Sequence, residues 1–186
     1  YPVEVQYEGD SDWKILPEMV CQVVKKAIKS QDGDVLVFLP GQSEIKKSQE
    51  LLRRSLTNFK IVPLYGQLPP SKQFAAIMPD NGGKRKVILA TNIAETSLTV
   101  QGIKIVIDSG FERVAKFNSK SGLSRLETVQ ISKESADQRK GRAGRLSEGI
   151  CYRLWSKVTQ SRMKEQSTPE IEQADLTSLV LDLAKW

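Results

Sequence analysis

The sequence predicts an α/β fold in which helices flank a parallel sheet, and three observations lead to that fold class. Short apolar and β-branched runs alternate with stretches of helical periodicity, as in strands joined by covering helices. The central runs, such as KVILA at residues 86–90, are almost wholly apolar, as parallel strands buried on both faces should be. The length of 186 residues suits one domain with a sizeable core, and no repeat or low-complexity tract is present.

Six runs are expected to be strands because β-branched and apolar residues dominate them. They are residues 35–39 (VLVFL), 61–64, 86–90, 104–108 (KIVID), 128–131 and 150–154.

Helices are expected between these runs. Residues 14–30 place apolar side chains at steps of three and four before the turn QDGD, and residues 43–56 repeat that pattern. A short helix should begin near Lys72, after the turn LPPS, and should end before the loop PDNGG at 79–83. Residues 171–186 are expected to be helical, and their end at Trp186 within that pattern suggests that more chain follows.

Composition excludes several classes of function. The chain has no histidine and only two distant cysteines, so we expect no metal site and no histidine-dependent catalytic triad. No run approaches the roughly 18 apolar residues of a membrane span, and the acidic N-terminal segment does not resemble a signal peptide. We therefore expect a cytoplasmic protein without a membrane partner. The net charge of +6 favours a polyanionic partner such as nucleic acid without requiring one.

The segment QRKGRAGR at 138–145 carries the clearest chemistry. Arg139, Arg142 and Arg145 recur every third residue, and on a helix this spacing would place their guanidinium groups along one face. Such donors suit the oxygens of phosphate, and the neighbouring glycines would let another surface approach. The alternative is a basic helix that contacts nucleic-acid backbone or water, although two glycines cost such a helix about 1 kcal/mol each.

A second polar cluster, ATNIAETS at 90–97, follows the strand KVILA directly. Ligands of open parallel sheets bind at the carboxyl ends of the strands, where short hydroxyl and amide side chains can bind phosphate. The alternative is a capped helix start, with Thr91 or Asn92 as N-cap and Glu95 completing a capping box. The two interpretations are compatible.

Together, ATNIAETS and QRKGRAGR resemble motifs V and VI of the DEAH/RHA branch of superfamily 2 helicases. In the same order, LVFLPGQSEI resembles motif IV, PLYGQLP resembles motif IVa, and VIDSGFERVAKFNSKSGLSRL resembles the strand and β-hairpin after motif V. Within the branch, ERVAKF, SGLSRL and GRAGRLSEGICYRLW are similar to the bacterial HrpB type. The resemblance covers essentially the whole chain.

The resemblance implies a RecA-like parallel sheet flanked by helices with an inserted β-hairpin. Residues 1–160 would form the second RecA-like domain, with the hairpin at about 111–128, and residues 161–186 would lead into a further domain. The family's first RecA-like domain supplies the phosphate loop and the acidic Mg²⁺ motif, and neither motif occurs here. The partners would be that first domain and single-stranded RNA or DNA, with ATP and Mg²⁺ bound mainly on the first domain. The chain alone is predicted to be inactive.

For the ATP site, the resemblance implies that Arg142 and Arg145 are arginine fingers and that Gln138 reaches the γ-phosphate or its attacking water. Ser97 would sense the state of the nucleotide, and Arg139 would have a structural or RNA-side role.

The sequence departs from the family pattern at two positions that would contact the sugar and the base of the nucleotide. Gln101 stands where many relatives carry an acidic residue on the ribose, and Ile77 stands where an aromatic often stacks on the base. These differences imply broad nucleotide choice.

For RNA, the resemblance implies contacts from Gly41, Thr91, Asn92, Thr96 and Arg113. The hairpin would lie where strands separate, and its Lys and Arg residues suit a phosphate backbone. An exposed hairpin whose charges serve solubility is the alternative.

Two other functions stay open. The chain could belong to a DNA helicase or translocase, because similar arginine motifs occur outside this branch. It could also be a non-catalytic nucleic-acid-binding module in which the arginines only clamp phosphate backbone.

Overall fold

A parallel sheet forms the centre of the computed structural model, which describes residues 1–10, 12–80, 82–96, 100–118, 122–169 and 177–185. Among these residues six strands pair in the order β1-β8-β5-β2-β4-β3, all parallel. The strands are β1 (Val3–Tyr7), β2 (Asp34–Phe38), β3 (Lys60–Leu64), β4 (Lys86–Ala90), β5 (Ile103–Asp108) and β8 (Gly149–Arg153). The predicted α/β class is confirmed.

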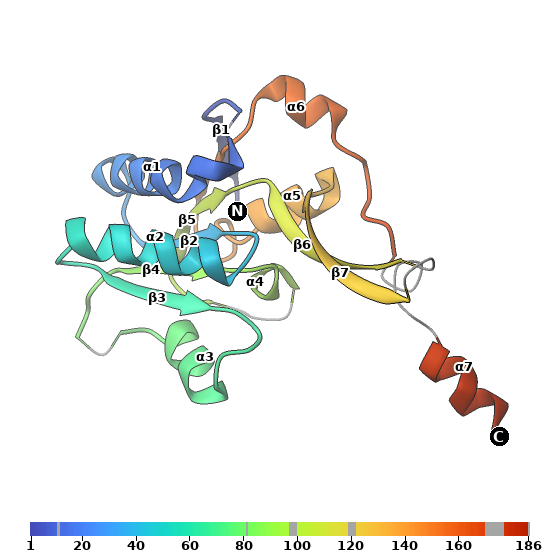
Figure 1. The fold of residues 1–186 in the computed structure, drawn as a ribbon. Coiled ribbons are helices and arrows are strands. Elements are labelled where there is room, and N and C mark those ends of the chain that lie inside the picture. Colours follow the sequence, from blue (N-terminus) through green and yellow to red (C-terminus); the bar gives the residue numbers. More distant parts are fainter. Residues whose placement is uncertain (11, 81, 97–99, 119–121, 170–176, 186) are drawn as a thin grey trace.

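The two faces of the sheet build two cores because side chains alternate along each strand. Val35 and Val37 of β2 pack with α1 (Leu16–Ser30) and α2 (Gln42–Ser55) on one face. Leu36 and Phe38 pack on the other face, with α3 (Pro70–Ile77) and α4 (Ile93–Thr96). Also on that second face, α5 (Lys133–Lys140) lies beside β5 and α4 (Figure 1).

A two-stranded hairpin extends from the sheet. It consists of β6 (Phe111–Asn118) and β7 (Leu123–Gln130), paired antiparallel from Phe111↔Gln130 to Asn118↔Leu123. Because β6 starts three residues after β5 ends, the hairpin begins at the carboxyl edge of the sheet (Figure 1). The expected hairpin is confirmed, but residues 128–130 belong to it and not to the parallel sheet.

Two elements of the body were not expected from the sequence. Strand β1 lies at the edge of the sheet and is only half-buried, so its residues VEVQY lack the continuous apolar character of the central strands. The short helix α6 (Lys157–Arg162) begins at the N-cap Ser156, whose hydroxyl accepts from Thr159 N at 3.0 Å.

The C-terminal residues that the structure describes include a helix, as expected. Helix α7 (Thr177–Ala184) lies within the expected helix 171–186 and stands apart from the body in Figure 1. The expected domain boundary at residue 160 falls inside α6, and Met163 packs with Ile131, Ala136 and Trp155. The boundary itself stays a prediction. No helix in the described ranges has the length and apolar character needed to cross a membrane.

Candidate functional site

The carboxyl edge of the sheet brings together residues predicted to contact RNA. Gly41 follows β2, and Thr91 and Asn92 follow β4. Phe38 and Ala90 are register partners on these neighbouring strands, so the segments after them start side by side. Thr91 is half-buried and Asn92 is exposed. This edge therefore presents short polar groups close to the N-terminus of α2.

Arg113 joins Gly41 from the root of the hairpin. Its guanidinium donates to Ser43 Oγ at 3.1 Å and to Glu44 Oε1 at 3.0 Å. It also lies so close to Gly41 that a Cβ added there would meet the end of the Arg113 side chain. The carboxylate of Glu44 neutralises part of the charge of Arg113. Arg113 thus fastens β6 to α2, whatever it contributes to RNA binding.

The arginine segment does not continue α5, contrary to the expected helix. The helix ends at Lys140, and the next residues form successive tight turns, in which Arg142 N donates to Arg139 O and Ala143 N to Lys140 O, both at 3.1 Å. The three arginines therefore do not share one helical face.

Gly144 lets the segment pass close to the N-terminal strand. A Cβ there would lie 2.5 Å from the backbone oxygen of Tyr1 and 2.7 Å from Val3 Cγ2. The surface that approaches this glycine is the chain's own N-terminal strand, so its role is internal packing and not access for phosphate.

Arg139 is not part of a phosphate-binding fork, because its side chain is buried and only 1% exposed. Its guanidinium donates to Glu95 Oε2 at 2.7 Å and to Asp108 Oδ1 at 3.0 Å, and lies 3.6 Å from Glu112 Oε2. It also stacks over the Phe38 ring at 5.0 Å. Removing one partner of such a buried pair typically costs about 3–5 kcal/mol. Of the two roles that the resemblance implies for Arg139, these contacts correspond to the structural one.

Arg142 and Arg145 both lie in the turns that follow α5. Arg142 is 6% exposed and donates from Nη2 to the backbone oxygen of Glu95, whereas Arg145 is exposed. Burial lowers the pKa of the Arg142 guanidinium, and the nearby charge of Arg145 lowers it further, while Glu95 acts in the opposite direction. Two cations held together in this way favour an anion beside them.

Glu95 replaces the expected capping box with a tertiary contact. Its carboxylate accepts from Arg139, on a different helix. The turn of α4 is held by backbone bonds instead, with Thr91 O accepting from Ala94 N at 3.2 Å and Asn92 O from Glu95 N at 2.9 Å.

The other predicted site residues are dispersed around these groups. Gln138 is exposed on the last turn of α5, and Gln101 is exposed in the turn before β5. Ile77 ends α3 and is half-buried against the second core face. Thr96 ends α4, and Ser97 lies outside the described residues.

Sequence analysis assigned no role to Lys86, which supports the end of α3 at Ile77. The buried Lys86 Nζ donates to Ala76 O at 2.9 Å and to Met78 O at 2.7 Å, and so holds the carboxyl end of α3. Burial lowers the pKa of this amine, and Asp34 acts in the opposite direction. A lysine at the start of an apolar strand was the only available signal, and it does not name its partners.

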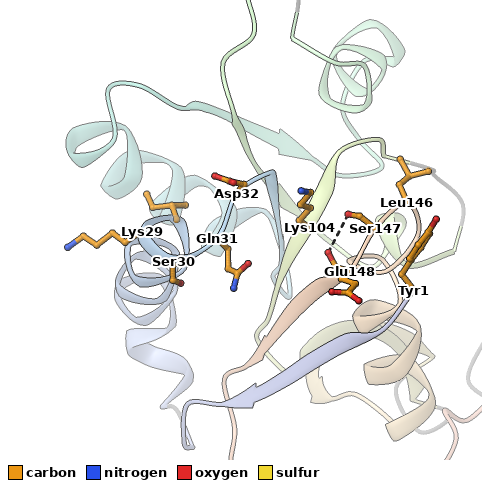
Figure 2. A pocket seen from close by; sticks show the side chains of 10 residues that line it. Tyr1, Lys29, Ser30, Gln31, Asp32, Lys104, Leu146, Ser147 and Glu148 are labelled. Atoms are coloured by element: carbon orange, nitrogen blue, oxygen red, sulfur yellow. Dashed lines mark hydrogen bonds between the residues drawn. The ribbon is translucent and has the colours of Figure 1, made fainter.

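A pocket of about 710 Å³ lies at the opposite, amino edge of the sheet. Figure 2 shows Lys29, Asp32, Lys104 and Glu148 around it, a mixture of charges without a common direction. None of the predicted site residues that the structure describes lines this pocket, so it is not part of the candidate site.

Comparison with known proteins adds independent support for the family. Residues 16–147 match the model of the helicase conserved C-terminal domain. The chain is 43% identical to the ATP-dependent RNA helicase HrpB of Escherichia coli and 43% identical to the ATP-dependent RNA helicase HrpA of Borreliella burgdorferi. These alignments cover 100% and 99% of the chain but 23% of each relative. A crystal structure of the Escherichia coli DEAH/RHA helicase HrpB superposes over the whole chain with a TM-score of 0.92, and the chain covers 24% of it.

Proposed function

Because the chain belongs to the helicase conserved C-terminal domain family, and within it to the DEAH/RHA branch, we propose that it is the second RecA-like motor domain of an ATP-dependent RNA helicase. It spans about a quarter of the relatives it matches, so a first RecA-like domain of the same protein would hold the nucleotide. This chain would close the cleft from the other side. In isolation it would not hydrolyse ATP.

The observation that carries the proposal is the proximity of Arg142 and Arg145. Arg142 is anchored on the backbone of Glu95 in the turn after β4, and the exposed Arg145 lies near enough to lower its pKa. Phosphate oxygens would relieve that repulsion and accept bidentate hydrogen bonds from the guanidinium groups. The pair therefore suits a triphosphate presented by another domain.

In the proposed mechanism the two arginines act as fingers. During phosphoryl transfer, negative charge accumulates on the equatorial oxygens, and fixed guanidinium groups stabilise it. Gln138, four residues before Arg142 and exposed on α5, would orient the attacking water. We assign Mg²⁺ mainly to the first domain, because this chain lacks the acidic motif of that domain. Among the residues that the structure describes, no group of three His, Cys, Asp or Glu side chains could hold a metal.

The carboxyl edge would bind single-stranded RNA. Thr91 and Asn92, with Gly41 on the neighbouring segment, present small polar groups suited to a sugar–phosphate backbone. Since the turn of α4 carries both these residues and the anchor of Arg142, RNA and ATP would contact one short stretch of chain. This proximity supports a motor in which each ligand influences the other.

Substitution of the arginine pair in the full-length protein tests the proposal. We expect Arg142→Ala and Arg145→Ala each to lower kcat for ATP about a thousandfold, as for removal of an arginine finger, with RNA affinity retained. Arg54→Ala is the matched control, because Arg54 is 72% exposed on α2 and pairs only with Glu50 among its described contacts.

The measurements are steady-state ATP hydrolysis and equilibrium binding of a fluorescent single-stranded RNA. If both arginine variants lose RNA affinity in proportion to turnover, the pair is a backbone clamp, and the finger mechanism is wrong.

A further inference from the structure

The buried guanidinium of Arg139 connects four elements of the domain, and the proposed function gives it no role. Arg139 lies on α5 and contacts Glu95 of α4, Asp108 at the end of β5, and both Phe111 O (3.3 Å) and Glu112 at the start of β6. All of these contacts are inside the domain. One side chain thus joins the ATP-facing segment to the root of the hairpin.

The contacts of Arg139 are unequal. The distances to Glu95 and Asp108, 2.7 and 3.0 Å, are those of hydrogen bonds, but the 3.6 Å to Glu112 is too long for one. Burial raises the pKa of Glu112, Arg139 opposes that rise, and the negative charges of Glu95 and Asp108 add to it. Glu112 is therefore held least firmly, and it is the one carboxylate of the three that belongs to the hairpin.

Glu95 extends this connection to the arginine pair. Its carboxylate accepts from Arg139 while its backbone oxygen accepts from Arg142. A displacement of the hairpin root can thus reach Arg142 through Glu112, Arg139 and Glu95. Glu112 also lines a pocket of about 420 Å³ between the hairpin and residues 162–168, which leaves its side chain room to move.

We propose that Arg139 and Glu112 form a positioning pair that couples nucleic acid at the hairpin to the arginine pair at the ATP site. This inference rests on the proposed function. RNA bound along the hairpin fixes Glu112 against Arg139, and Arg139 in turn holds Glu95 where its carbonyl orients Arg142. Without the charge of Glu112, the ATP site still assembles, but RNA no longer influences it.

The test is the RNA stimulation of ATP hydrolysis by the full-length protein, measured as the ratio of kcat with saturating poly(U) to kcat without RNA. We expect Glu112→Gln to lower this ratio at least about fivefold, the lower end of typical coupling between sites, and to leave the RNA-free rate within about twofold. A merely structural role would reduce both rates together and leave the ratio unchanged.

Glu127→Gln is the matched control. It removes the same charge from the same hairpin, but Glu127 is 43% exposed and pairs with Lys116. We expect it to keep the wild-type ratio. Arg139→Lys keeps the positive charge but offers one donor group in place of a planar fork, so it should lower the ratio as Glu112→Gln does.

If Glu112→Gln and Glu127→Gln show the same ratio, or if both rates fall in proportion in Glu112→Gln, the coupling role is wrong. If Arg139→Lys does not fold, the two glutamate variants decide alone. Wild-type protein without RNA-stimulated hydrolysis would overturn the proposed function as well, whereas wild-type stimulation that persists in Glu112→Gln overturns only this inference.

Discussion

At the scale of single residues, Glu95 connects the two proposed ligand regions of the domain. Its carboxylate accepts a hydrogen bond from Arg139, and its backbone oxygen accepts one from Arg142. Glu95 therefore connects the proposed RNA-binding segment before it to the arginine segment. A substitution at Glu95 would leave the buried Arg139 with one fewer carboxylate and would free α4 from α5. We therefore regard Glu95 as a structural hub and not as a helix cap.

Nucleotide choice also belongs to the residue scale. Gln101 is exposed and neutral, and a neutral amide forms a weaker hydrogen bond to ribose hydroxyls than a carboxylate does. Ile77 offers no aromatic face to the base. We expect the full-length protein to hydrolyse GTP, CTP and UTP with kcat/KM within about tenfold of that for ATP, which corresponds to a discrimination between nucleotides of about 1.4 kcal/mol at most. Strict use of ATP in parallel assays of the four nucleotides would refute this expectation.

At the scale of elements, the arginine segment depends on strand β1. The segment turns away from α5 at Gly141 and passes Gly144 against the backbone of Tyr1, next to the β1–β8 pairing. The edge strand that sequence analysis missed therefore supports the residues that matter most for the proposed chemistry. The packing of β1 against this segment determines where Arg145 projects from the domain.

Gly144→Ala tests this dependence. The added methyl would overlap Tyr1 O and Val3 Cγ2, and such overpacking typically costs about 1–3 kcal/mol. We expect amide hydrogen exchange in β1 and β8 of the full-length protein to become about 5 to 150 times faster, as local opening becomes easier by that free energy. Gly66→Ala is the control, since the nearest heavy atom to its Cβ would be Ile93 Cδ1 at 4.0 Å. Equal exchange in both variants would show that β1 does not support the segment.

Sequence patterns predicted the strands that are buried along most of their length. The central strands β4 and β5 are mostly apolar and buried, and they appear within one residue of the expected bounds. The edge strand β1 is half-exposed and mixes charge with apolar residues, so periodicity could not distinguish it.

For the arginine segment, the sequence pattern predicted a longer helix than the structure contains. Three-residue spacing favours a helix, but the contact of Gly144 with residues 1–3 is a tertiary effect, and the sequence does not show which segments will meet. The motif itself contains both Arg142 and Arg145. The partners of Arg139, by contrast, lie up to 44 residues away in the chain, where the motif does not indicate them. The motifs thus indicated the residues of the candidate site, whereas the contacts that bury Arg139 and Arg142 and leave Arg145 exposed were not predictable from them.

At the scale of the whole molecule, the topology places the two proposed ligand regions next to each other. Strands β2 and β4 end side by side at the carboxyl edge, where RNA is proposed to bind, and α4 and α5 lie on one face of the sheet and carry the contacts to Arg142. The hairpin begins at the same edge and is tied back by Arg113 to α2 and by Glu112 to α5. In the proposed function such a domain would form one side of a cleft, with nucleotide on the α4–α5 face and RNA across the strand ends.

The most direct test of the proposed finger mechanism is a structure of the full-length protein with single-stranded RNA, ADP and aluminium fluoride. Aluminium fluoride imitates the phosphoryl group in transfer. We expect guanidinium nitrogens of Arg142 and Arg145 at about 2.7–3.1 Å from the fluoride or the β-phosphate, with Arg139 still buried among its carboxylates. A structure in which both arginines lie on the RNA backbone, with the nucleotide contacted by the first domain alone, would contradict it.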